Sequence, residues 1–67
     1  MGSDDMKNRL EEILHEKGVK KSWLADKVGV NQNTISRITK GAEPKLTNAY
    51  KIARVLGVTV YDIWPPD

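Results

Sequence analysis

The stretch KSWLADKVGVNQNTISRIT, residues 21–39, decides the fold of this chain. Ala25 is followed four residues later by Gly29, and Ile35 lies six residues beyond the glycine. A small side chain at Ala25 lets a second helix cross closely, Gly29 can adopt the positive φ of a sharp turn, and Ile35 can fill the angle between the helices. The remaining inward positions are Leu24, Val28, Val30 and Ile38. The pattern predicts two short helices joined at a steep angle.

Further helices are expected on both sides of this stretch, because apolar residues recur there every three to four positions. The expected helices cover residues 6–17, 21–28, 31–39, 46–56 and 60–64. Asn31 is a suitable N-cap for the third helix, and Gly57 follows directly after the fourth, as glycine often does at a helix end. Thr59 and Asp62 have the spacing of a capping box before the last helix. Because no strand pattern is present, the sequence predicts an all-α fold.

The length of 67 residues leaves room for one small domain. We expect residues 1–5 to be an expression remnant outside the fold, residues 6–64 to form the domain and residues 65–67 to be a tail. The sequence has no cysteine, which excludes disulfides and thiolate metal sites. No apolar run approaches the roughly 20 residues of a bilayer span, and no signal peptide is recognisable, so we expect a cytoplasmic protein without membrane contact.

Positive charge is concentrated in the middle of the chain. Residues 17–54 contain nine of the eleven Lys and Arg residues but only two of the nine acidic residues, Asp26 and Glu43. This asymmetry is typical of a surface that binds a polyanion, but an unevenly charged solvated surface has the same pattern. Charge alone leaves both interpretations open.

The helical pattern resembles the helix-turn-helix domain of the phage Cro and repressor type, the XRE family. The residues that carry the resemblance are Leu24-Ala25, Gly29-Val30, Thr34-Ile35-Ser36, Lys40-Gly41 and Ile52-Ala53-x-x-Leu56-Gly57-Val58. It covers about residues 7–64 and implies a compact five-helix, lambda-repressor-like domain whose second and third helices form the helix-turn-helix. The implied function is a transcriptional regulator, in our expectation a repressor, that binds a palindromic operator in double-stranded DNA as a homodimer.

The resemblance places the third helix in the major groove, where its outward side chains would contact base edges. These side chains are Gln32, Asn33, Ser36 and Arg37. Gln and Asn can form two hydrogen bonds with adenine, and Arg can do so with guanine. An ordinary solvent face would also be polar, but within this motif we expect these residues to read bases.

Lysines occupy two helix starts at which relatives usually have capping residues. At the start of the second helix, Lys20 stands where relatives have a Ser or Thr cap, and Lys21 stands where they have the Gln that follows it. Before the fourth helix, Lys45 follows Pro44 at a position where Ser is common. Lysine is a poor N-cap and is repelled by the positive helix end, which suggests that function outweighs stability here. The residues expected to contact DNA phosphates are Lys20, Lys21, Asn31, Lys40 and Lys45.

Two further expectations follow from the resemblance. Many relatives pair an Arg late in the first helix with a Glu after the third, but this chain has Leu14 and Thr39 there, and we expect these two residues to touch as an uncharged replacement. Family members commonly pair near the C-terminus, so Val60, Tyr61 and Trp64 are expected to form a two-fold contact. The alternative for Trp64 is that it covers the monomer core.

No enzymatic activity, metal, cofactor or small-molecule ligand is expected. His15 is a lone histidine, and the acidic residues of the first helix are best interpreted as its solvated face. No Gly-rich phosphate loop or nucleophile–base set occurs. The main alternative is a protein-interaction adaptor or an antitoxin component, whose docking face should carry aromatics and Met. RNA binding is weaker, because no aromatic stacking platform is evident.

Overall fold

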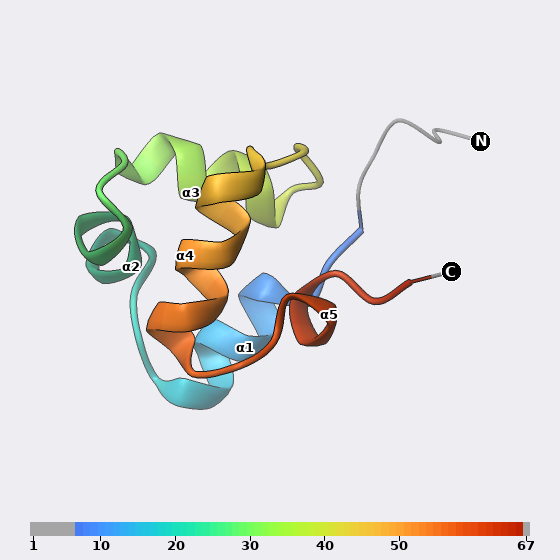
Figure 1. Cartoon of the computed structure of the whole chain (residues 1–67). Helices are drawn as coiled ribbons and strands as arrows, with labels where there is room; N and C mark the ends of the chain where they lie inside the picture. Colours follow the sequence, from blue (N-terminus) through green and yellow to red (C-terminus); the bar gives the residue numbers. More distant parts are fainter. Residues whose placement is uncertain (1–6, 67) are drawn as a thin grey trace.

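The computed structural model describes residues 7–66, which fold into five helices (Figure 1). The helices are α1 (Leu10–Lys17), α2 (Lys21–Val28), α3 (Gln32–Thr39), α4 (Leu46–Leu56) and α5 (Val60–Ile63). No strand occurs in this part of the chain, and the predicted all-α fold is confirmed. The expectation that residues 1–5 are a remnant lies outside the described residues.

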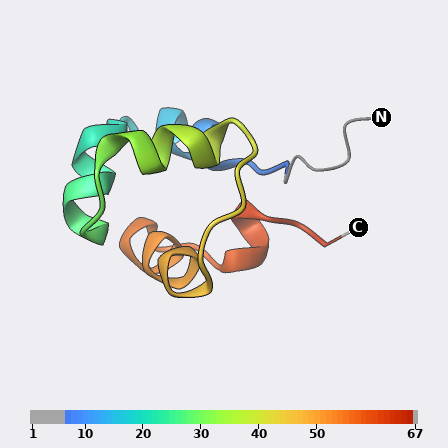
Figure 2. The same ribbon diagram turned by 90° about the horizontal axis from the view of Figure 1, so that it is seen from above.

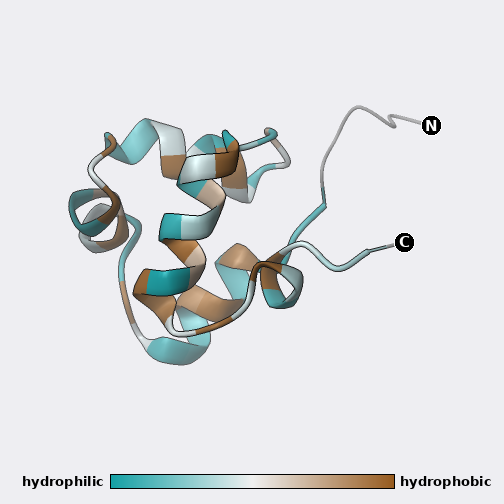
Figure 3. Cartoon of the chain, in the orientation of Figure 1, coloured by the Kyte–Doolittle hydropathy of each residue, from teal (hydrophilic) through white to brown (hydrophobic). Residues whose placement is uncertain are grey.

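A single core of aliphatic side chains and Trp64 joins the five helices. Each helix contributes one large side chain that is fully buried: Leu10, Leu24, Ile35, Ile52 and Ile63. Burial of such a side chain contributes about 1.5–3 kcal/mol. Hydrophobic and hydrophilic segments alternate along the helices in Figure 3, as expected for short helices that each bury one face. The position of α3 is therefore set by apolar packing on its inner side.

The turn between α2 and α3 has the geometry that the sequence predicted. Gly29 has a φ of 90°, and the backbone N–H of Val30 donates to the carbonyl of Ala25 at 3.0 Å. Ala25 and Ile35 are both buried at this junction. A residue with a Cβ would be strained at Gly29, because L side chains rarely adopt this backbone conformation. Figure 2 shows α3 running between α2 and the loop that leads to α4.

The first helix begins later than predicted. Residues 7–9 are not helical, so the expected start at residue 6 is wrong for this part of the chain, and α1 begins at Leu10. The Asn8 side-chain oxygen accepts a hydrogen bond from the Leu10 N–H at 2.9 Å. Asn favours such local bonds over continued helix, which explains the late start. At the other end of the chain, α5 ends at Ile63, one residue before the predicted end.

The predicted capping box of α5 is confirmed. The backbone N–H of Thr59 donates to the Asp62 carboxylate at 2.9 Å, and the Asp62 N–H donates to the Thr59 hydroxyl at 3.1 Å. The hydrogen bond from the Thr59 backbone, with a smaller contribution from its side chain, lowers the pKa of Asp62. This box fixes the start of a helix of only four residues.

Candidate nucleic-acid interface

The start of α3 is held by Asn31. Its side-chain oxygen accepts hydrogen bonds from the N–H and the hydroxyl of Thr34, at 3.0 and 3.1 Å. The expected N-cap is thereby confirmed, and the side-chain oxygen is committed to the helix. The amide NH2 is the group of Asn31 that can meet a phosphate, because it is a donor.

The outer face of α3 brings together the residues expected to read bases. Gln32, Asn33 and Arg37 are exposed, whereas Ser36 is half-buried and its carbonyl accepts from the Thr39 hydroxyl at 2.7 Å. Asn33 and Arg37 are four residues apart and therefore share one face. Neither ion pair found in residues 7–66 involves Arg37. The guanidinium and the two amides are thus presented together to solvent.

Lysines lie at both ends of α3. Lys20 and Lys21 line a hollow of about 390 Å³ between α1, α2 and the start of α3, and Gln32 lines the same hollow. Lys40 follows the last residue of α3, and Lys45 precedes α4 across a short loop. Positive charge therefore flanks the polar face of α3 on both sides, an arrangement suited to a polyanion that runs along the helix.

The starts of α2 and α4 have no side-chain cap. Lys20 and Lys45 occupy the N-cap positions, and neither makes a capping hydrogen bond. The first N–H groups of both helices therefore have no capping side chain from the N-cap residue as an acceptor. A helix start with an adjacent lysine is favourable for a phosphate group.

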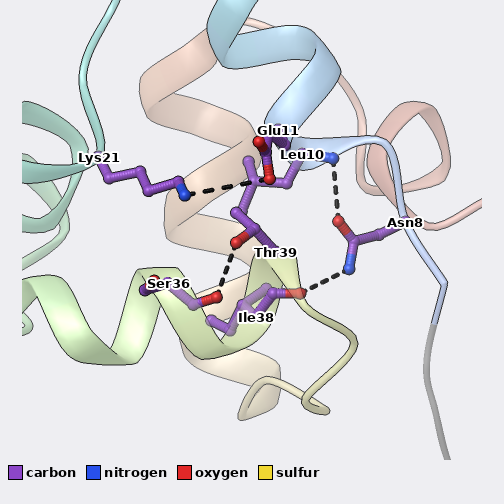
Figure 4. Close-up of polar contacts among 7 residues, drawn as sticks. All are labelled: Asn8, Leu10, Glu11, Lys21, Ser36, Ile38 and Thr39. Carbon is purple, nitrogen blue, oxygen red and sulfur yellow. Dashed lines mark hydrogen bonds and ion pairs between the residues drawn. The ribbon is translucent and has the colours of Figure 1, made fainter.

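Lys21 has an acidic neighbour that sequence reasoning assigned only to the solvated face of α1. Its Nζ lies 4.0 Å from a carboxylate oxygen of Glu11, and Figure 4 shows the lysine reaching from α2 toward that residue. The Lys21 side chain is 30% exposed and that of Glu11 is 70% exposed. No spacing rule could have found this pair, because its members belong to different helices.

The residues expected at the dimer contact separate into two groups. Trp64 is 6% exposed and belongs to the core, which agrees with the alternative stated for it. Val60 is half-buried and Tyr61 is 71% exposed. Both line a hollow of about 650 Å³ between α4 and α5, together with Tyr50, an exposed aromatic residue that sequence reasoning missed.

The link between α1 and α3 is made by a residue that the sequence did not single out. The Asn8 amide nitrogen donates to the carbonyl of Ile38 at 2.8 Å (Figure 4). Leu14 is buried in the core, and the Thr39 hydroxyl bonds within its own helix. Contact between Leu14 and Thr39 stays a prediction. The sequence signal that could have identified Asn8 is the tendency of Asn to bind the start of a helix, because Asn8 stands two residues before Leu10, the first apolar residue of α1.

Two classes of site are not found in the described part of the chain. No group of three or more His, Cys, Asp and Glu residues among residues 7–66 is placed to hold a metal ion. None of the helices in this range is both long enough and apolar enough to cross a membrane.

The chain belongs to the helix-turn-helix family of the XRE type, because the family's sequence profile matches residues 10–63. The resemblance drawn from the sequence is therefore confirmed. Proteins of this family are DNA-binding transcription regulators and do not form an enzyme class.

Relatives and a solved structure support this assignment. Two uncharacterised helix-turn-helix transcriptional regulators of Archaeoglobus fulgidus are 40% and 38% identical to the chain over 60 residues, covering 88% of it and 86% and 84% of their own lengths. One from Methanocaldococcus jannaschii is 40% identical over 60 residues, covering 88% of this chain and 91% of its own. The crystal structure of a candidate DNA-binding protein from Bacteroides fragilis matches with a TM-score of 0.78 at 34% identity, covering 85% of this chain and 94% of that one.

Proposed function

We propose that this protein is a cytoplasmic transcriptional repressor that binds a palindromic operator as a homodimer. The observation that carries the proposal is the outer face of α3, where Gln32, Asn33 and Arg37 are exposed together between lysines at both helix ends. This arrangement fits a helix that lies in the major groove with phosphates on either side. The named DNA-binding and regulatory roles of the relatives support the same function.

The proposal divides the site into two roles. Gln32, Asn33 and Arg37 distinguish bases, because amides and guanidinium groups form two-point hydrogen bonds with adenine and guanine. Ser36 is the fourth base-reading residue of this set. The phosphate contacts supply affinity without regard to sequence and come from Lys20, Lys21, Asn31, Lys40 and Lys45.

The homodimer is proposed to form through the surface between α4 and α5. Tyr61 is 71% and Tyr50 is 60% exposed beside a hollow that Val60 also lines. Exposed aromatics beside a hollow are typical of protein contacts. A two-fold contact here would set two copies of α3 about one DNA turn, roughly 34 Å, apart.

The same aromatic surface also favours the second candidate function, an adaptor or antitoxin component that binds a different protein through α4 and α5. The two functions differ in what α3 must do. A protein-docking module does not need a polar α3 flanked by lysines, whereas a repressor needs this surface to bind DNA. Selection of bound duplexes from a random DNA pool separates them, because only the repressor should enrich a palindrome.

Variants of the two roles test the proposal at the site itself. Arg37→Ala should remove the preference at one base pair of each half-site, a loss of about 1–3 kcal/mol on the selected duplex and little elsewhere. Lys21→Ala should weaken selected and random duplexes about equally and lower the slope of log affinity against log salt by about one unit. Equal loss on all duplexes for Arg37→Ala would instead make Arg37 a phosphate contact.

A further inference from the structure

The segment before α1 is bonded to the far end of α3. The half-buried Asn8 uses both ends of its amide: the oxygen accepts from the Leu10 N–H at 2.9 Å, and the nitrogen donates to the Ile38 carbonyl at 2.8 Å. Ile38 lies in the last turn of α3, thirty residues along the chain. Figure 4 shows this side chain lying between the two helices. One residue therefore joins the start of α1 to the end of α3.

The next residue bonds to a third helix. The backbone N–H of Arg9 donates to the carbonyl of Ile63, the last residue of α5, at 2.8 Å. The Arg9 side chain is about half exposed and pairs with Glu12 at 3.0 Å, so the hydrogen bond to α5 comes from the backbone of Arg9. Two consecutive residues, Asn8 and Arg9, thus hold the end of α3 and the end of α5.

The directional character of this link matters for base reading. The inner side of α3 is held by the buried side chains of Ile35 and Ile38, and the Asn8 bond adds a directional contact at the end of the helix. A hydrogen bond has a preferred distance and angle. α3 has eight residues and is therefore about 12 Å long, so a small tilt about its end moves the side chains of its first turn. Two-point base contacts tolerate a displacement of only about 0.5 Å.

We infer that Asn8 is a positioning residue that fixes the orientation of α3 relative to α1 and, through Arg9, relative to α5. The inference rests on the proposed function and deepens it, because the placement of α3 relative to α5 would set both the angle at which bases are read and the spacing of the two half-sites. Asn8 itself contacts no base in this arrangement.

Two substitutions separate positioning from folding. Asn8→Ser keeps a hydroxyl acceptor for the Leu10 N–H, because Ser forms the same side-chain bond to the backbone two residues on, more weakly than Asn, but it has no amide to reach Ile38. Asn8→Asp keeps the shape and the acceptor but presents an oxygen to the Ile38 carbonyl. Ile52→Val is the matched control, since it removes one methylene group from the core in α4 and leaves the link intact.

The test measures binding to the selected palindrome, to palindromes with one base pair added to or removed from the spacer, and to random duplex. Each variant is studied where circular dichroism shows it to be folded. Both Asn8 variants should lower the ratio of selected to random affinity about five- to tenfold, the lower end of the range of one lost base contact, and should relax the spacer preference. The affinity of Asn8→Ser for random DNA and its salt slope should match the wild type. Asn8→Asp adds a carboxylate that repels phosphates on every duplex, so it is compared with the wild type by its ratio and spacer preference alone. Ile52→Val should keep the wild-type ratio.

Two results would overturn the inference in distinguishable ways. Folded Asn8→Ser and Asn8→Asp proteins with the wild-type ratio and spacer preference would show that the link does not position α3, with the proposed function intact. If the wild-type protein did not prefer any duplex over random DNA, the proposed function itself would be wrong, and the positioning role of Asn8 would be wrong with it.

Discussion

Lys20 and Lys45 leave the starts of two helices without a side-chain cap. Each occupies an N-cap position without a capping hydrogen bond, whereas Asn31 and Thr59 cap their helices with side-chain oxygens. A missing cap costs about 1 kcal/mol, which is a substantial fraction of the stability of a small domain. The N-cap of α1, Arg9, also makes no capping hydrogen bond, but there the Asn8 side chain binds the Leu10 N–H. The starts at Lys20 and Lys45 belong to the helices that flank α3 along the chain, where positive charge would serve the proposed DNA contact.

Glu11 opposes the proposed role of Lys21, and its removal should strengthen DNA binding. The carboxylate lies 4.0 Å from the Lys21 ammonium group and is exposed, so it both competes with a phosphate for the lysine and repels that phosphate. Exposed ion pairs are worth at most about 1 kcal/mol. Glu11→Gln should therefore raise affinity for selected and random duplexes alike by about two- to fivefold in a titration at moderate salt.

The control for this experiment is Glu16→Gln, which removes an exposed carboxylate from the same helix but not one paired with Lys21. It should change affinity less than Glu11→Gln. Equal increases for both variants would mean that only net charge matters and that the Glu11–Lys21 pair has no role of its own.

Helix boundaries were predictable where their signals are local in sequence. The ranges of α2 and α4 agree with expectation, because Gly29 and Gly57 end these helices in the left-handed conformation that the sequence suggested. The start of α1 was not predictable from periodicity. It depends on Asn8, whose second partner, the Ile38 carbonyl, is brought within reach only by the tertiary fold. The candidate site divides in the same way: the outer face of α3 followed from its sequence, whereas the Glu11–Lys21 pair required the packing of α1 beside α2.

The capping box of α5 should make stability depend on acid pH. Hydrogen bonds from Thr59 lower the pKa of Asp62 below its ordinary value of about 3.9, so the unfolded chain binds this proton more readily than the folded one. The stabilisation is complete above about pH 4 and is lost as the pH falls through the lower, folded pKa. Asp62→Asn keeps an oxygen for the Thr59 N–H but cannot ionise, and neutral hydrogen bonds are weaker than charge-assisted ones.

Urea unfolding of the wild type and of Asp62→Asn at about pH 7 and about pH 2.5 measures this effect. The wild type should be the more stable protein at neutral pH, and the difference should shrink in acid. The pKa of Glu12 is also lowered, by its hydrogen bond with Arg9, so both proteins should retain some acid sensitivity. A stability difference that is the same at both pH values would show that ionised Asp62 does not stabilise α5.

The molecule as a whole presents two surfaces with different chemistry. One is the polar, lysine-flanked face of α3, and the other is the aromatic surface between α4 and α5. The second surface was only partly predictable. The sequence indicated an aromatic C-terminal region, but whether Tyr61 or Trp64 lies outside depends on how α5 packs, and Tyr50 of α4 joins only Tyr61 at this surface. Because the core already buries Trp64, Tyr61 is the better probe of the proposed dimer.

Tyr61→Glu should separate the dimer from the fold. Tyr61 is 71% exposed, so its replacement should change the free energy of unfolding by less than about 0.5 kcal/mol. Glu is also tolerated in the first turn of a helix, where the dipole favours negative charge. Trp64→Ala is unsuitable, because truncation of a buried Trp costs about 3–5 kcal/mol, comparable to the whole stability of so small a domain.

A two-fold contact uses the same surface of both chains, so Tyr61→Glu would place two carboxylates in the proposed contact while leaving α3 unchanged. The variant should bind an isolated half-site with wild-type affinity but lose cooperative binding to the palindrome, and sedimentation of the complex should show single occupancy at protein concentrations that give two wild-type chains per duplex. Tyr61→Phe, which keeps the ring, should behave as the wild type. If two Tyr61→Glu chains still bound the palindrome cooperatively, the dimer contact would not lie at α5. The aromatic surface would then be assigned to a different protein partner.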